Sequence, residues 1–122
     1  WLDAEERLRN LASDLGLPVI ELERVLDPGN AQSAYGSGYV LDTLWSAKSA
    51  VENTRSYQDC VRAAIALGHD TDTTAAVAGG IAGLKYGLKG VPDRWRSELR
   101  GEAIYRPLLD ALLAGHIAPG NE

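Results

Sequence analysis

The chain has 122 residues, of which 45% are hydrophobic and 24% charged, as is usual for one globular domain. Its net charge of −5, with acidic and basic residues interspersed, excludes the basic face by which proteins bind nucleic acid. The single cysteine, Cys60, excludes an internal disulfide, and the longest apolar run, Ala75 to Leu84, is too short to span a bilayer. We therefore expect a cytoplasmic protein with no nucleic-acid or membrane partner.

The first predicted elements are two helices. Leucines recur at helical spacing in a first segment, which Asp3 would cap and Gly16 would end. Pro18 then permits a short second helix that continues to Leu26. Small and polar residues over positions 30–38 predict a loop after it.

The rest of the chain is also predicted to be helical. Apolar residues recur with helical spacing over residues 40–51, 57–67, 74–86, 92–99 and 104–113. Ser56 and Asp59 are spaced as a capping box for the helix over 57–67, and Gly115 would end the last helix. No segment alternates apolar and polar residues with the period of a strand. The sequence therefore predicts an all-α fold.

Oxygen-bearing side chains are dense over residues 68–74, between two predicted helices. Asp70 and Asp72 could not share one face of a helix, but in a loop they could converge, with the hydroxyl of Thr73 beside them. Such oxygen donors suit Mg²⁺ or Ca²⁺ rather than zinc. In the structural alternative, Asp72 or Thr73 merely caps the helix that would begin near Thr74.

Glycines recur along the next predicted helix. Gly79, Gly83 and Gly87 are spaced four residues apart and share one helix face, with Gly80 beside them. Because a glycine inside a helix costs up to about 1 kcal/mol relative to alanine, the row predicts that another backbone packs closely on this face. On that account Gly83→Leu would overpack the contact.

Three stretches together carry a family pattern. They are Ser37-Gly38-Tyr39-Val40-Leu41-Asp42-Thr43-Leu44, residues 64–76 around Asp-Thr-Asp-Thr, and residues 79–83. This combination resembles the ADP-ribosylglycohydrolase family, which includes enzymes that remove ADP-ribose from dinitrogenase reductase, and also the J1 crystallins. The resemblance runs from about Gly36 to Leu99 and extends to Leu113. It implies a compact, multi-helix fold of which residues 1–122 form the C-terminal part of a single domain.

The resemblance also implies a metal centre. Members of the family hold two Mg²⁺ ions, which Mn²⁺ could replace, in a central cleft. Asp70, Asp72 and Thr73 match the C-terminal group of metal ligands in that pattern. Paired metals about 3.5–4 Å apart can orient the ribose hydroxyls and activate the attacking water.

A second group of residues matches the family's contacts with ADP-ribose. Ser37, Gly38 and Tyr39 correspond to a loop that lies against the ribose and phosphates. In the alternative interpretation Ser37 and Gly38 are only turn residues, and Tyr39 is a buried aromatic at the entry to a helix.

Other parts of the family pattern have no match in this sequence. The family also needs a Thr-Asp-Asp metal motif and an acidic residue near the attacking water, both in an N-terminal half, whereas this chain opens on Trp1 and an acidic segment that is unlike a signal peptide. We therefore expect a C-terminal fragment or a natural remnant, with the catalytic acid in the missing half, on the same or a separate chain.

Two functions follow as expectations. In the first, the complete protein hydrolyses the bond between ADP-ribose and a modified protein or small molecule, and this chain alone is inactive. In the second, the chain is a non-catalytic helical module that is structural or completes a site with a partner chain.

Overall fold

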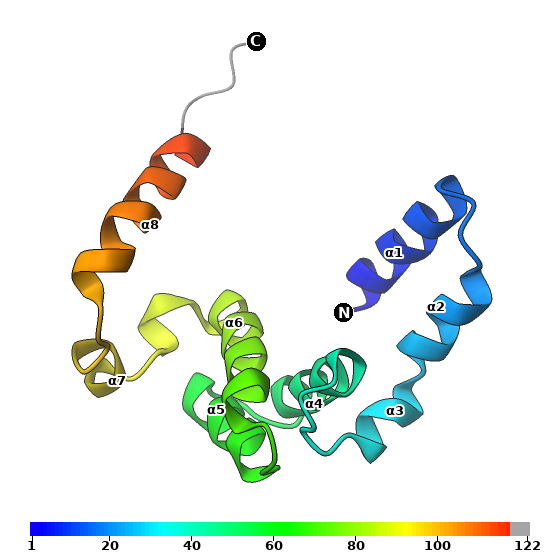
Figure 1. Cartoon of the computed structure of the whole chain (residues 1–122), viewed down its shortest axis with the longest axis horizontal. Coiled ribbons are helices and arrows are strands. Elements are labelled where there is room, and N and C mark those ends of the chain that lie inside the picture. Colours follow the sequence, from blue (N-terminus) through cyan, green and yellow to red (C-terminus); the bar gives the residue numbers. More distant parts are fainter. Residues whose placement is uncertain (118–122) are drawn as a thin grey trace. The chain divides into compact units, whose positions relative to one another are not determined.

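A computed structural model describes residues 1–117, and within this range it holds eight helices and no strand (Figure 1). The all-α prediction is therefore confirmed. The helices are α1 (Leu2–Asp14), α2 (Val19–Leu26), α3 (Pro28–Ser33), α4 (Val40–Glu52), α5 (Tyr57–Ala66), α6 (Thr71–Gly90), α7 (Asp93–Ser97) and α8 (Glu102–Ile117). They form two compact units, one from Trp1 to Val91 and one from Pro92 onward.

The core of the first unit lies where α4, α5 and α6 pack together (Figure 1). Its buried side chains are nearly all small: Ala47, Ala50, Val51, Cys60, Ala64, Ala78 and Ala82. Small side chains allow helix backbones to approach closely, and the Sγ atom of Cys60 on α5 lies 3.8 Å from the carbonyl oxygen of Ala78 on α6. This packing determines how the first turns of α4 and α6 are placed, and those turns carry the candidate functional residues.

Short polar side chains mark the starts of α5 and α6. The hydroxyl of Ser56 accepts the backbone N–H of Asp59 at 3.0 Å and donates to its carboxylate at 2.7 Å, which confirms the predicted capping interaction. Asp70 is the N-cap of α6, because its Oδ1 atom accepts the N–H of Thr73 at 3.3 Å. In both helices a side-chain oxygen satisfies a backbone N–H that has no partner within the helix.

Several helix boundaries differ from the sequence prediction. α1 begins at Leu2, so that Asp3 lies inside the first turn and is not its cap. α3 occupies part of the expected loop, because the carboxylate of Asp27 accepts the N–H of Gly29 at 2.8 Å and a proline follows it at the first helical position. α8 runs through Gly115, which therefore does not end it.

The glycine row of α6 was predicted to pack against another helix, and within the described residues this holds at Gly79 but is wrong for the other three glycines. A Cβ atom on Gly80, Gly83 or Gly87 would meet nothing within 4 Å, whereas one on Gly79 would lie 3.2 Å from the hydroxyl of Tyr57. Helical spacing places the glycines on a common face but does not determine what covers that face. Gly87 instead interrupts the helix, with φ 66° and ψ 178°, a backbone conformation that glycine adopts without steric cost.

Two leucine substitutions on α6 should therefore have different effects. Ala78→Leu should destabilise the protein by about 1–3 kcal/mol, because the side chain of Ala78 is fully buried against α5. Gly83→Leu should cost little or stabilise by up to about 1 kcal/mol, because its surroundings are open and leucine favours helix. Urea denaturation measures both changes. Equal losses from the two variants would contradict a core built on small side chains.

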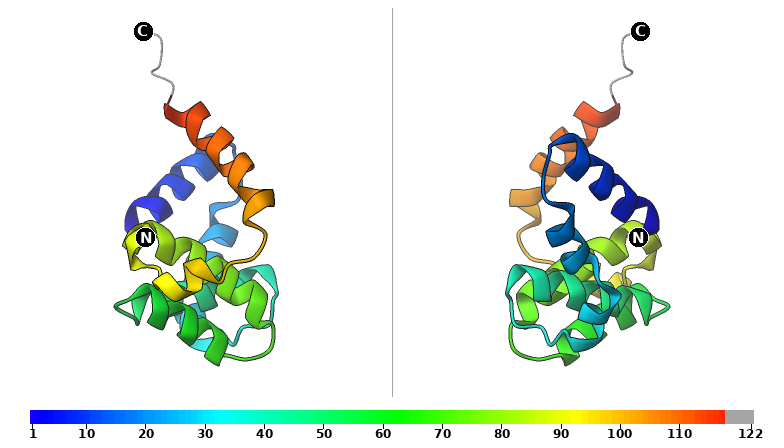
Figure 2. Two further views of the ribbon diagram at one scale, coloured as in Figure 1. Left: turned by 90° about the vertical axis from the view of Figure 1, so that its left-hand side faces the viewer. Right: turned by 90° about the vertical axis from the view of Figure 1, so that its right-hand side faces the viewer.

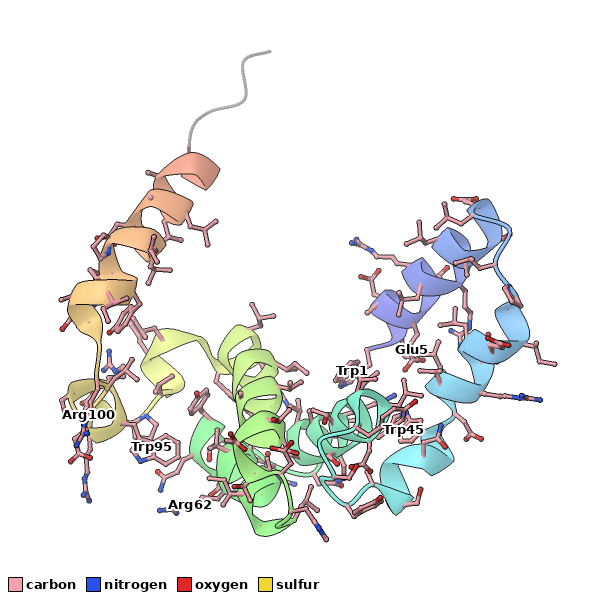
Figure 3. The ribbon with its side chains drawn as sticks, in the orientation of Figure 1. Trp1, Glu5, Trp45, Arg62, Trp95 and Arg100 are labelled. Atoms are coloured by element: carbon pink, nitrogen blue, oxygen red, sulfur yellow. The ribbon has the colours of Figure 1, made fainter. Side chains whose placement is uncertain are left out.

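The helices α1 and α2 follow one another as a helical hairpin at the start of the chain (Figure 2). Trp1, Glu5 and Trp45 lie at this junction (Figure 3). The indole N–H of Trp45 donates to the carbonyl of Val25 at 2.8 Å, and Lys48 donates to Glu5 at 2.8 Å. Two polar contacts therefore join the hairpin to α4, and most of the hairpin's leucines stay exposed.

The second unit contains α7 and α8. Ion pairs along the helices join Arg94 to Glu98 at 3.0 Å and Arg106 to Glu102 at 2.8 Å. Each is an exposed pair one helical turn apart, and such pairs typically contribute about 0.3–0.5 kcal/mol. None of the helices within residues 1–117 has the length and apolarity that crossing a bilayer requires.

Candidate metal and substrate site

The predicted metal ligands lie on the N-cap and first turn of α6. The chain reaches this point through two residues in the left-handed region, Gly68 with φ 78° and His69 with φ 56°. Asp70 then caps the helix by accepting the N–H of Thr73. Asp72 and Thr73 therefore belong to the helix rather than to a loop, and neither is its cap.

The side chains of Asp70, Asp72 and Thr73 gather closely. The Thr73 side chain, the Asp72 side chain and the Thr73 amide lie within hydrogen-bonding reach of the Asp70 carboxylate, and they hold its pKa below the ordinary value. Burial of Asp70 acts in the opposite direction and is the smallest of these effects. Asp70 is therefore ionised at neutral pH, with a second carboxylate and a hydroxyl beside it.

This donor set fits a hard divalent cation. Two carboxylates and one hydroxyl offer oxygen atoms only, which Mg²⁺ and Mn²⁺ prefer over nitrogen or sulfur. Within residues 1–117 no group of three or more His, Cys, Asp or Glu side chains lies close enough together to hold a metal. Mg²⁺ prefers six oxygens, so the group at α6 leaves positions to be filled by water, substrate or further protein oxygens.

The predicted substrate segment, Ser37, Gly38 and Tyr39, lies directly against the start of α6. The carbonyl oxygen of Gly36 accepts the N–H of Asp70 at 2.9 Å. Gly38 has φ 80°, and a Cβ atom built on it would come within 2.0 Å of the Asp70 Oδ2 atom. The Asp70 carboxylate therefore occupies the space that any side chain at position 38 would need, and the fold brings the two predicted groups into contact.

Ser37 and Tyr39 have different environments. The hydroxyl of Ser37 accepts the N–H of Tyr39 at 3.4 Å, a local bond that is typical of a turn residue. The Tyr39 side chain is 63% exposed, so it is not the buried aromatic of the alternative interpretation. Its ring is open to contact with a ligand beside Gly38.

Two buried side chains of α4, Asp42 and Ser46, accept hydrogen bonds from the backbone of residues 35–37. No role for either was predicted from the sequence. Asp42, which is 6% exposed, accepts the N–H of Ser37 at 2.6 Å and that of Tyr35 at 3.1 Å, while the buried hydroxyl of Ser46 accepts the N–H of Gly36 at 3.1 Å. Burial by itself would raise the pKa of Asp42, but the bonds from the Ser37 and Tyr35 amides outweigh it and hold the pKa below its ordinary value. The sequence shows an aspartate in the first turn of a predicted helix, but it does not show that this aspartate bonds to residues outside the helix.

An apolar hollow of about 390 Å³ opens beside Gly38 and Thr73. Its other lining residues are Val40, Leu41, Thr43, Leu44 and Val77, from α4 and α6. Ligand sites commonly combine an apolar wall with a few polar groups that orient the ligand. The hollow and the oxygen donors of α6 together have that character.

An aromatic contact joins the two segments at a further point. The rings of Tyr35 and His69 meet edge to face, with centroids 5.5 Å apart and an interplanar angle of 80°. Tyr35 immediately precedes the Gly36–Gly38 stretch, and His69 immediately precedes Asp70. This ring contact offsets part of the conformational free energy that it costs His69 to adopt a left-handed backbone.

Comparison with known proteins shows which family this sequence matches. The sequence model of the family described as ADP-ribosylglycohydrolase matches residues 2–121, nearly the whole chain. The chain belongs to the ADP-ribosylglycohydrolase family. The resemblance first seen in the Asp-Thr-Asp-Thr motif and its flanking stretches is therefore confirmed. No solved structure gives a significant match.

Curated ADP-ribosylglycohydrolases are much longer than this chain. It is 46% identical over 63 residues to an ADP-ribosylarginine hydrolase of Serratia proteamaculans, a match that covers 52% of this chain and 17% of the relative. It is 36% identical over 90 residues to the ADP-ribosyl-[dinitrogen reductase] glycohydrolase of Rhodospirillum rubrum (72% and 30%). It is 33% identical over 101 residues to the ADP-ribosylhydrolase ARH3 of Mus musculus (78% and 27%). The chain thus spans less than a third of the length of these relatives.

Proposed function

We propose that this chain supplies the C-terminal part of the active site of a magnesium-dependent ADP-ribosylglycohydrolase. The complete enzyme would hydrolyse the glycosidic bond between ADP-ribose and a modified protein or small molecule. The observation that supports the proposal is the meeting of Asp70, Asp72 and Thr73 with the Gly38 segment, in a chain of this family. The relatives carry names that describe the removal of ADP-ribose from arginine and from dinitrogen reductase.

In this proposal Asp70, Asp72 and Thr73 hold the metal through their oxygens. The lowered pKa of Asp70 suits this role, because a carboxylate must be ionised to bind a cation. A bound divalent ion would polarise substrate oxygens and lower the pKa of a bound water. Mn²⁺ could replace Mg²⁺, since both prefer oxygen ligands.

Ser37, Gly38 and Tyr39 would contact ADP-ribose. Gly38 has no side chain, so a ligand can approach the backbone of this turn closely. The exposed ring of Tyr39 and the apolar hollow provide surfaces for the less polar parts of the ligand. We place the acidic residue that acts on the attacking water in the N-terminal half of the complete enzyme, as the family resemblance implies.

Replacing Asp72 tests this proposal. Asp72→Ala in the complete enzyme should lower Mg²⁺-dependent turnover by at least about 10–100-fold. That is the typical loss when a residue that only supports a metal ligand is replaced, and Asp72 would bind the metal itself. Stability should change by less than about 0.5 kcal/mol, because Asp72 is exposed. Release of ADP-ribose from a modified arginine peptide, followed across a Mg²⁺ titration, measures the first effect, and thermal unfolding measures the second.

Asp14→Ala is the matched control. Asp14 is also an exposed aspartate, at the end of α1, and lies outside the candidate site. Its replacement should leave both turnover and the Mg²⁺ requirement unchanged. An Asp72→Ala variant that keeps full turnover at every Mg²⁺ concentration would refute the assignment of this residue as a metal ligand.

A further inference from the structure

We propose that Asp42 is a positioning residue of this active site, whose buried carboxylate determines where Gly38 and Asp70 meet. The inference rests on the proposed function, since it concerns the residues that would bind metal and ADP-ribose. Asp42 itself would touch neither. It would act through the backbone of residues 35–38, which its two oxygens hold in place.

A comparison of two helix starts shows that Asp42 is not an ordinary capping residue. Asp59 and Asp42 occupy the same third position of α5 and α4. Asp59 bonds locally, to the hydroxyl of the N-cap residue Ser56. The N-cap of α4, Tyr39, makes no side-chain capping bond, and the Asp42 carboxylate instead reaches beyond the helix to Tyr35 and Ser37. Asp42 therefore organises the preceding segment rather than the end of its own helix.

Residues 35–38 contact Asp42 on one side and Asp70 on the other, so the position of Asp42 affects that of Asp70. Ser37, whose N–H lies 2.6 Å from the Asp42 carboxylate, is followed by Gly38, which has no room for a Cβ beside Asp70. On the other side Gly36 gives its N–H to Ser46 and accepts the N–H of Asp70 through its carbonyl oxygen. A small displacement of the segment would therefore change both the backbone bond and the side-chain packing of Asp70.

The chemistry of the site requires a carboxylate at position 42. Two backbone N–H groups point at two different oxygens, and only an ionised carboxylate offers an acceptor at both places. In Asp42→Asn one of the two N–H groups would face an amide NH₂ group, which is also a donor. The segment would have to shift or lose one bond, although the side chain keeps nearly the same shape.

Hydrogen exchange in the full-length protein without ligand gives the first test. Asp42→Asn should speed amide exchange at least about tenfold in peptides that cover residues 35–38 and in those that cover residues 68–73. Asp59→Asn, the matched control, should speed exchange only around the start of α5. Equal exchange at residues 68–73 in the two variants would overturn the proposal, whether or not the protein binds ADP-ribose.

The affinities for Mg²⁺ and ADP-ribose give the second test. They would not change if Asp42 only stabilised the fold. Asp42→Asn should weaken the binding of Mg²⁺ and of ADP-ribose by about 10–100-fold, as the loss of a supporting residue typically does, whereas Asp59→Asn should change neither by more than about twofold. Unchanged affinities in Asp42→Asn would overturn the proposal. If the wild-type protein binds no ADP-ribose, the proposed function fails, and the exchange result still decides the role of Asp42.

Ser46→Ala gives a second variant in case Asp42→Asn does not fold. It removes the hydroxyl that accepts the N–H of Gly36 at 3.1 Å and leaves Asp42 in place. Exchange at residues 68–73 should again rise, by less than in Asp42→Asn, because the neighbouring N–H groups stay bonded. An unchanged exchange rate in Ser46→Ala would show that the segment does not hold Asp70 and would likewise overturn the proposal.

Discussion

Gly38→Ala should abolish magnesium-dependent hydrolysis in the complete enzyme and destabilise the fold by roughly 2–4 kcal/mol. The added Cβ atom would lie 2.0 Å from Oδ2 and 2.8 Å from Cγ of Asp70, so the carboxylate must leave its position. Overpacking of this kind typically costs about 1–3 kcal/mol. The left-handed backbone at φ 80° adds about 1 kcal/mol for any residue other than glycine. Turnover and thermal unfolding measure the two effects.

Gly16→Ala separates the two causes. Gly16 is also in the left-handed region, with φ 66°, but a Cβ atom there would meet nothing within 4 Å. Its replacement should lower the free energy of unfolding by only about 1 kcal/mol, the cost of a left-handed backbone at alanine, and should leave turnover unchanged. If Gly38→Ala loses no more stability than Gly16→Ala and still hydrolyses substrate, Asp70 does not depend on the space at Gly38.

Residues 1–122 alone should show no appreciable ADP-ribosyl hydrolase activity, whereas the complete enzyme should be active. Mg²⁺ prefers six oxygens in octahedral geometry and gives up water reluctantly. Asp70, Asp72 and Thr73 can hold one ion weakly through their oxygens, but three ligands at one helix start cannot fix two ions. The acidic residue that acts on the attacking water also belongs to the half of the family pattern that has no match in this sequence.

The test compares the chain alone with the same chain joined to the N-terminal half that the family pattern requires. Both are assayed on an ADP-ribosylated substrate in millimolar Mg²⁺, with circular dichroism to establish that the short chain is helical. Turnover only in the long form is the expected result. Robust turnover by the short chain, abolished by Asp72→Ala, would show that its three ligands suffice.

Much of the candidate site could be predicted from the sequence, because its groups are local. Asp70, Asp72 and Thr73 are near neighbours in the chain, and because Asp70 is the N-cap rather than a helical residue, its carboxylate lies beside the side chains of the first turn. The sequence left open which of these residues caps the helix. Asp70, Asp72 and Thr73 are all of types that cap helices, and composition does not distinguish which one precedes the first helical residue.

The glycine row shows the limit of periodicity. The spacing of Gly79, Gly83 and Gly87 fixed their common face, because the helical repeat depends on the backbone alone. Whether a neighbour covers that face depends on how α6 packs against α4 and α5, and α5 covers it at Gly79 but not at Gly83 or Gly87.

The sequence by itself determined the all-α class, the family pattern and the oxygen donors at the start of α6. Each depends on short stretches of the chain that can be read without knowing how those stretches pack. Only the tertiary structure decided that Gly38 lies against Asp70 and that Asp42 and Ser46 hold the intervening backbone. These contacts exist because α4, α5 and α6 pack through alanines, which brings two distant helix starts together. Close packing of this kind depends on the shapes of many side chains at once, and no local pattern records it.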